Sequence, residues 1–306
     1  MSDDPGFPAL EDVGIAERDK PPFVRLPKPE TLFGLRAMRF AALAPGHQLE
    51  AYLLFLSEVA KAQDALARAL PAPALPPLAE MRRRAGHAMP ILPREELAGE
   101  PSAMAALVEL PALLAAVVMP EQARAALGRI AQASDEHRQA MLAAVLADAV
   151  PVEAFAEHIF AAAALQVAAA RRAALLDPLL PQPVADGVCP CCGGPPVSSA
   201  VVGDANIEGV RYVQCSLCAT QWNHVRVKCV SCGSTKGIAY QEIEGVADTI
   251  KAETCDECRT YVKILYQRKD MELESVADDV ASLGLDLLVT EAGWRRAGVN
   301  PFLLGY

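Results

Sequence analysis

Residues 189–192 read CPCC, 215–218 read CSLC, 229–232 read CVSC and 255–258 read CDEC, and the rest of the chain can be placed around these four short stretches. They hold all nine cysteines of the 306 residues. Eight of the nine form four C-x-x-C pairs: Cys189/Cys192, Cys215/Cys218, Cys229/Cys232 and Cys255/Cys258. Adding 40 to each of the first four positions gives each of the last four. The chain therefore contains an internal repeat of one supersecondary unit.

This spacing is that of a metal site built from cysteine. Two cysteines separated by two residues can hold one ion from a single tight turn, and two such turns complete a tetrahedron of thiolates. Pro190 restricts φ in the first turn. Gly193 and Gly233 follow the second cysteine of their pairs, where a left-handed backbone lets amides point at sulfur. The sequence therefore predicts two four-cysteine metal sites.

The repeat favours one way of sharing the ligands. In a local pairing each copy of the repeat is complete: the first four cysteines hold one ion and the last four hold the other. In an interleaved pairing, as in cross-brace domains, the repeat would be accidental.

Disulfide bonds between the cysteines are a competing interpretation. The chain begins Met-Ser-Asp-Asp-Pro, without the basic and apolar segments of a secretory signal, so we expect reducing conditions and free thiols.

The spacing does not separate zinc from iron, because both ions accept four thiolates in a tetrahedron. A closed shell leaves no position for substrate, so we expect an ion that is structural or transfers electrons.

Cys191, inside the first pair, has two interpretations. The favoured one is a spare thiol; the other is a redox-active or exchangeable thiol beside the metal.

The charge distribution argues against nucleic-acid binding. The formal net charge is −10, and residues 188–268 carry eight basic and eight acidic side chains, so the cysteine region is neutral. Binding to phosphates requires a cationic footprint.

The longest uncharged apolar runs, 110–120 and 159–170, are shorter than the roughly 20 residues of a membrane span, so we expect buried helices there. No H-E-x-x-H, glycine-rich phosphate loop or G-x-S-x-G motif is present, so we predict no catalytic residue and no enzyme.

The remaining sequence predicts an α+β fold. Apolar periodicity indicates helices at about 31–43, 47–70, 78–87, 102–118, 121–132, 135–148 and 152–176, with Pro111 breaking or kinking one of them. Candidate strands are 197–202, 210–213, 221–227, 238–243, 249–253 and 261–266, and two further helices are expected at 271–282 and 285–296. Glu253 and Asp256, which flank Cys255, are expected either to steer a partner or to be plain ribbon surface.

We therefore expect an all-α N-terminal domain, two tandem zinc-ribbon-like four-cysteine modules and a C-terminal helical segment. The expected boundaries are an extended arm over 1–30, the helical domain over 31–180, the first ribbon over 188–227, the second over 228–268, and C-terminal helices with a docking tail over 269–306.

Four stretches resemble the FdhE family of accessory proteins for formate dehydrogenase maturation: 189–193 (CPCCG), 212–233 (YVQCSLCATQWNHVRVKCVSCG), 253–263 (ETCDECRTYVK) and 300–302 (NPF). The resemblance is specific from residue 189 to about 302, and over 1–180 it rests on helical character. It implies a cytoplasmic protein with rubredoxin-like centres, with iron favoured and zinc as the alternative. It also implies that the partner is the catalytic subunit of a respiratory, molybdenum- or tungsten-dependent formate dehydrogenase, which the protein helps to become active before export. Carried over residue by residue, the eight paired cysteines are the metal ligands, and no catalytic residue carries over.

Two other functions stay open at this point. The first is a rubredoxin-like electron-transfer protein, in which one or both sites hold iron. The second is a zinc-ribbon nucleic-acid binder, which the neutral cysteine region disfavours.

Overall fold

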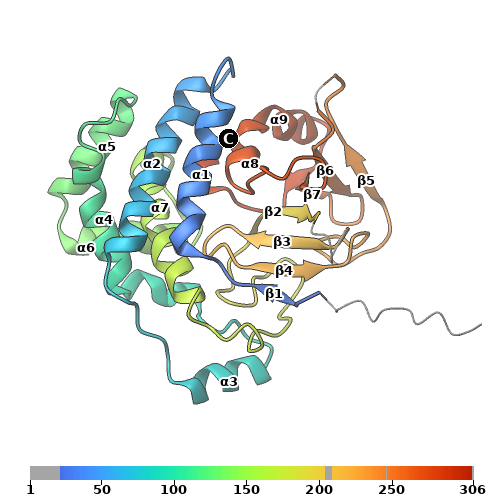
Figure 1. Ribbon diagram of the computed structural model, residues 1–306, viewed down its shortest axis with the longest axis horizontal. Helices are drawn as coiled ribbons and strands as arrows, with labels where there is room; N and C mark the ends of the chain where they lie inside the picture. Colours follow the sequence, from blue (N-terminus) through green and yellow to red (C-terminus); the bar gives the residue numbers. More distant parts are fainter. Residues whose placement is uncertain (1–20, 204–208, 246, 305–306) are drawn as a thin grey trace, which may run out of the picture.

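The computed structural model describes residues 21–203, 209–245 and 247–304, which form a helical half and a sheet half side by side (Figure 1). Most of the predicted elements are present: the long helices precede residue 174, and the ribbon strands follow residue 195. The fold is therefore of the mixed class that the sequence predicts, with an N-terminal helical region followed by two cysteine-bearing ribbons. Residues 1–20 of the expected arm lie outside the described residues, while Val24–Arg25 form a short strand, β1.

The helical half is built around its last helix. Its elements are α1 (Pro29–Leu43), α2 (Glu50–Ala69), α3 (Leu78–Gly86), the 3₁₀ turn η1 (Arg94–Gly99), α4 (Pro101–Leu113), α5 (Glu121–Gln132), α6 (Asp135–Leu146), η2 (Val152–Ala154) and α7 (Phe155–Ala173). Helix α7 packs against α2, α4, α5 and α6. Its run Ala161–Ala164 is fully or almost fully buried, and side chains this small let neighbouring helices approach closely. Helix α4 continues through Pro111 and ends two residues later, so the expected interruption falls at the end of the helix.

One helical segment, Val152–Ala173, is long and apolar enough to cross a membrane by length and composition alone. In the fold it contains α7, and 67% of its apolar window is buried. It also carries buried polar side chains, including Gln166 and Arg172, which have protein partners. Its apolar character is accounted for by its central place in the helical half.

The two ribbons share one eight-stranded sheet. Its other strands are β2 (Pro196–Val201), β3 (Arg211–Cys215), β4 (Gln221–His224), β5 (Ile238–Gln241), β6 (Ile250–Cys255), β7 (Thr260–Tyr266) and β8 (Arg295–Arg296). The order is β1-β4-β3-β2-β7-β6-β5, with β8 on β7. Within each ribbon the strands are antiparallel, whereas β2 of the first ribbon pairs in parallel with β7 of the second. This parallel pairing, which the repeat did not predict, joins the ribbons edge to edge.

A continuous core joins the helices to the first ribbon. One cluster of buried side chains runs from Phe33 and Phe160 to Val213 and Cys218. Polar contacts tie the helices to the C-terminal segment as well: Arg39 on α1 makes a two-pronged ion pair with Asp278, at 2.8 and 2.9 Å, and the buried Arg36 contacts Glu274 at 3.1 Å. The helical half therefore packs against one ribbon more closely than against the other.

The C-terminal segment differs from the expected pair of long helices. Helix α8 covers only Ala277–Ala281, and α9 covers Leu283–Glu291. The side chain of Glu274 accepts hydrogen bonds from the amides of Val276 and Ala277, so the preceding residues serve as a cap rather than as helix. Gly293, at φ +96°, follows the end of α9, and the chain then enters β8.

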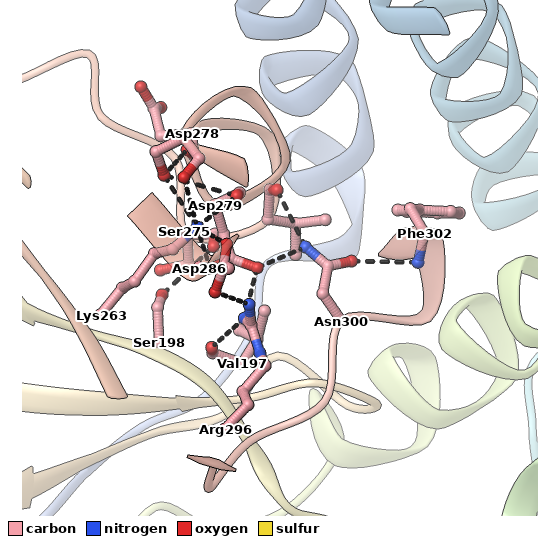
Figure 2. A network of polar contacts seen from close by, with 12 residues as sticks. Val197, Ser198, Lys263, Ser275, Asp278, Asp279, Asp286, Arg296, Asn300 and Phe302 are labelled. Carbon is pink, nitrogen blue, oxygen red and sulfur yellow. Dashed lines mark hydrogen bonds and ion pairs between the residues drawn. The ribbon is translucent and has the colours of Figure 1, made fainter. Parts of the chain in front are cut away.

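A buried polar network anchors the chain end (Figure 2). Lys263 on β7 is paired with Asp279 and Asp286, and Arg296 contacts both carboxylates as well. Two cations thus balance two carboxylates, which makes their burial tolerable. Asn300 donates to Asp279 at 2.8 Å, and its side-chain oxygen accepts the amide hydrogen of Phe302.

The described part of the tail packs against the helical half. Phe302 is 1% exposed, packs edge-on against Phe40 with ring centroids 6.4 Å apart, and accepts a hydrogen bond from Tyr52 at its carbonyl oxygen. The short 3₁₀ turn η3 (Pro301–Leu303) holds it there. These contacts tie the last described residues of the sheet half to α1 and α2.

Candidate metal centres

The first four-cysteine set lies where the first ribbon meets the helices. Cys189 and Cys192 lie in a turn just before β2, Cys215 is the last residue of β3, and Cys218 lies in the turn that leads from β3 to β4. The Sγ atoms of Cys189 and Cys218 are 3.6 Å apart, and those of Cys192 and Cys215 are 3.4 Å apart. All four sulfur atoms lie within 4.8 Å of one another.

The second set repeats this arrangement on the second ribbon. Cys229 and Cys232 precede β5, Cys255 is the last residue of β6, and Cys258 lies in the turn that leads from β6 to β7. The Sγ atoms of Cys229 and Cys258 are 3.7 Å apart, and those of Cys232 and Cys255 are 3.8 Å apart. The structure thus brings the eight cysteines together in the two sets of the local pairing.

These separations fit a tetrahedral ion. Four sulfur atoms at about 2.3 Å from a metal stand about 3.8 Å from one another. The observed 3.4–3.8 Å lie close to that edge length. A disulfide would require about 2.05 Å, and all nine cysteines are free thiols. The donor sets therefore fit Zn²⁺ or iron, and the role of these residues as ligands stays a prediction.

The repeat extends to the backbone of the turns. Gly193 and Gly233 have φ values of +77° and +73°, as expected from the sequence, and Ala219 and Arg259, which are equivalent in the two copies, have +58° and +54°. Amide hydrogens in the turns also point at sulfur: Gly194 donates to Cys192, Leu217 to Cys215 and Ser231 to Cys229, each at 3.4 Å. Such bonds favour the thiolate over the thiol, and thiolate is the form that binds metal.

Two threonines complete the sets and were missed by the sequence reasoning. The hydroxyl of Thr220 lies 3.2 Å from the sulfur of Cys218, and that of Thr260 lies 3.0 Å from the sulfur of Cys258. The signal that could have found them is the internal repeat itself, since both threonines stand two positions after the last cysteine of their copy.

Cysteines at equivalent positions of the two sets have pKa values shifted in the same direction. Burial raises the pKa of the Cys189 thiol well above its ordinary value, while for Cys218 burial is outweighed by hydrogen bonds from Cys189 and the other neighbours, and its pKa falls well below. In the second set, partial burial raises the pKa of Cys229 to about 12. Burial also opposes ionisation of Cys258, but hydrogen bonds from Thr260 and neighbouring thiols lower its pKa to about 7. A bound cation would replace the protons of the raised groups.

Cys191 belongs to neither set. Its side chain is fully buried, and its carbonyl oxygen accepts a 2.7 Å hydrogen bond from the amide of Leu92 in the helical half. A reactive cysteine needs access to solvent, so this placement favours the spare-thiol interpretation.

The expectation for Glu253 is wrong. This residue does not lie on the ribbon surface, and it is not free to steer a partner. It is 4% exposed and pairs with both terminal nitrogens of the buried Arg211, at 2.8 and 2.9 Å. The guanidinium also donates to Ser199. Arg211 lies on β3 and Glu253 on β6, so this pair links the two ribbons across the strands between them. Asp256, by contrast, is exposed and pairs with Arg259.

Fold and sites together define a protein with a helical domain and two four-cysteine ribbons suited to binding metal. Family models match along nearly the whole described chain: "FdhE, N-terminal" over residues 21–186, "FdhE, central domain" over 188–226 and "FdhE, C-terminal domain" over 227–303. The chain belongs to the FdhE family.

Individual relatives agree with the family models. The chain is 47% identical to the "Protein FdhE homolog" of Rhizobium meliloti (strain 1021) over 289 residues, which cover 94% of each chain. It is 33% identical to the "Protein FdhE" of Escherichia coli (strain K12 / DH10B), with 96% of each chain covered. Its fold matches the crystal structure of the FdhE protein from Pseudomonas aeruginosa with a TM-score of 0.80 and 32% identity, covering 93% of this chain and 99% of that one.

Proposed function

We propose that the chain is an accessory protein for the maturation of respiratory formate dehydrogenase, which binds the catalytic subunit of that enzyme in the cytoplasm. The observation that carries the proposal is the match to all three FdhE domain models in order, from residue 21 to residue 303. The resemblance of the cysteine stretches to this family supplies the partner.

In this proposal the eight paired cysteines hold two metal ions. The residues are Cys189, Cys192, Cys215 and Cys218 for one ion, and Cys229, Cys232, Cys255 and Cys258 for the other. Iron of the rubredoxin type is favoured, and zinc is the alternative. Both sets supply four thiolates and thus leave no open position for a substrate, so we assign the protein no catalytic activity of its own.

The test is capture of the catalytic subunit. The tagged chain should retain the catalytic subunit of formate dehydrogenase from the same organism during purification, and a strain without the chain should make the subunit but show little formate dehydrogenase activity. Full activity in that strain, together with no retained subunit, would reject the proposal.

A rubredoxin-like electron-transfer role is the second candidate, and the exposure of Cys232 favours it, since electron transfer requires a centre near the surface. Protein purified without added metal would then absorb visible light and bleach with dithionite. A colourless zinc protein would exclude it.

A further inference from the structure

The two cysteine sets differ most in their access to solvent. The four cysteines of the first set are between 0 and 2% exposed. In the second set Cys229 and Cys255 are buried, but Cys232 is exposed and Cys258 is partly exposed. An incoming ligand would therefore meet sulfur directly at the second set and meet other residues at the first.

The helical half covers the first turn of the first set. Three amides from the segment that runs from the end of α3 into η1 donate to this turn: Ile91 to the carbonyl of Pro190, Leu92 to that of Cys191 and Arg94 to that of Cys192, at 3.3, 2.7 and 3.0 Å. Ile91 and Leu92 are themselves buried. Opening this turn would break backbone hydrogen bonds and expose apolar surface at the same time.

Helix α7 covers the second turn of the same set. The side chain of Gln166, 3% exposed, donates to the carbonyl oxygen of Ser216 at 2.7 Å. Its own side-chain oxygen accepts from Arg36 and Gln63, so the amide is held in one orientation. Both turns of the first set are therefore hydrogen-bonded to the helical half.

The residues around the second set are more exposed to solvent than those around the first set. Beside its first turn lies the linker between the two halves, where Asp186 pairs with Lys228 at 2.7 Å and both side chains are about one-third exposed. Beside its second turn lie Trp294, stacked under Arg259, and β8. Strand β5, which follows Cys232, is the outer strand of the sheet, and its residues are exposed or half-buried. Sites with few buried contacts open at low free energy.

We propose that the second set, Cys229, Cys232, Cys255 and Cys258, is an exchange site that passes its ion to and from thiolate ligands outside the protein, whereas the first set keeps its ion as part of the core. The exchange is ligand substitution. An incoming thiol would give up its proton and take the coordination position of Cys232, and the displaced Cys232 sulfur would take up that proton, so neither the charge of the ion nor the number of protons would change. This inference rests on the two-ion part of the proposed function.

The experiment uses the full-length chain loaded with two zinc ions and the chromophoric chelator pyridylazoresorcinol. One zinc ion should leave quickly, and the second at least about 100-fold more slowly, because release from the covered site requires local unfolding. After the fast phase, N-ethylmaleimide followed by mass spectrometry should find the modification on the second set only. A single phase, or modification of the first set, would overturn the proposal.

Two buried glutamines supply matched variants. Gln166→Leu removes the hydrogen bond to Ser216, whereas Gln63→Leu removes a neighbouring bond of the same network and leaves that contact in place. The rate constant of the slow phase should be about tenfold higher in Gln166→Leu than in Gln63→Leu. The rate constant of the fast phase should be unchanged in both variants. Acceleration of the fast phase instead would contradict the assignment of the two phases.

Two acceptors separate the possible sources of thiolate. Reduced glutathione represents a soluble ligand, and a metal-free four-cysteine zinc-finger peptide represents a protein ligand. Each should take one zinc ion per chain, and the faster acceptor identifies the source; transfer of two ions or of none would overturn the proposal.

The capture experiment with the catalytic subunit is independent of the zinc-release experiments. Normal capture with equal release from both sets rejects only the exchange site, and two-phase release without capture rejects only the maturation role.

Discussion

The two ribbons have the same local design but different surroundings. Cysteine spacing, left-handed positions and threonine contacts recur at equivalent positions of the two copies. Yet β2 of the first ribbon is buried throughout, while its counterpart β5 in the second is mostly exposed. The difference teaches that short-range sequence builds the cysteine turns, whereas the neighbours of a turn decide how accessible its cysteines are to solvent.

The largest expected contrast comes from removing one ligand of each set. Cys215→Ser should destabilise the whole described fold, because this set lies in the main core. The loss should reach about 10 kcal/mol, the order of magnitude that a structural zinc ion contributes to folding. Cys255→Ser should release one ion and unfold mainly the second ribbon. Metal content and thermal unfolding followed by circular dichroism measure both effects, and release of both ions by either change would break the local pairing.

The next effect concerns the pair that links the ribbons. Arg211→Met leaves the buried Glu253 without its cation and should lower the free energy of unfolding by about 3–5 kcal/mol. Urea denaturation gives this value. As a control, Arg211→Met combined with Glu253→Leu should recover part of the loss, since no buried charge then stays unpaired. A single variant as stable as the wild type would show that the ribbons are not coupled through this pair.

A smaller effect should distinguish the turns themselves. A Cβ atom at Gly194 would lie 3.1 Å from the sulfur of Cys215 and 3.3 Å from that of Cys192, so Gly194→Ala should destabilise the first set by about 1–3 kcal/mol. The equivalent position of the second set is Ser234, and Ser234→Ala serves as the control with little expected change. Zinc-release rates and thermal midpoints test both. Equal effects at the two positions would mean that the first set is not the more crowded one.

The smallest effect belongs to the threonines. Thr220→Val and Thr260→Val each remove one hydroxyl contact to sulfur, and each should weaken zinc binding by about 1 kcal/mol. Competition with a chelator of known affinity measures the change. The loss should appear in the slow phase of release for Thr220→Val and in the fast phase for Thr260→Val; the reverse assignment would contradict the comparison of the two sets.

Much of the fold and site was predictable because it rests on local signals. The C-x-x-C pairs and their internal repeat predicted the grouping of eight cysteines, and apolar periodicity predicted α5 with its observed bounds, 121–132. Contacts between distant residues left no such signal. Glu253 reads as a surface residue beside a cysteine, and only the approach of Arg211 across the sheet makes its burial possible.

By itself, the sequence determined the chemistry of this protein: which sulfur atoms gather, in what number and in which turns, because two-residue spacing and left-handed glycines act within a few bonds. The tertiary structure alone decided the asymmetry of the two sets. The parallel pairing of β2 with β7 and the contacts of the helical half with residues 190–192 and 216 bring together segments far apart in the chain. Solvent access depends on that packing, so two nearly identical sequence motifs become one covered site and one accessible site.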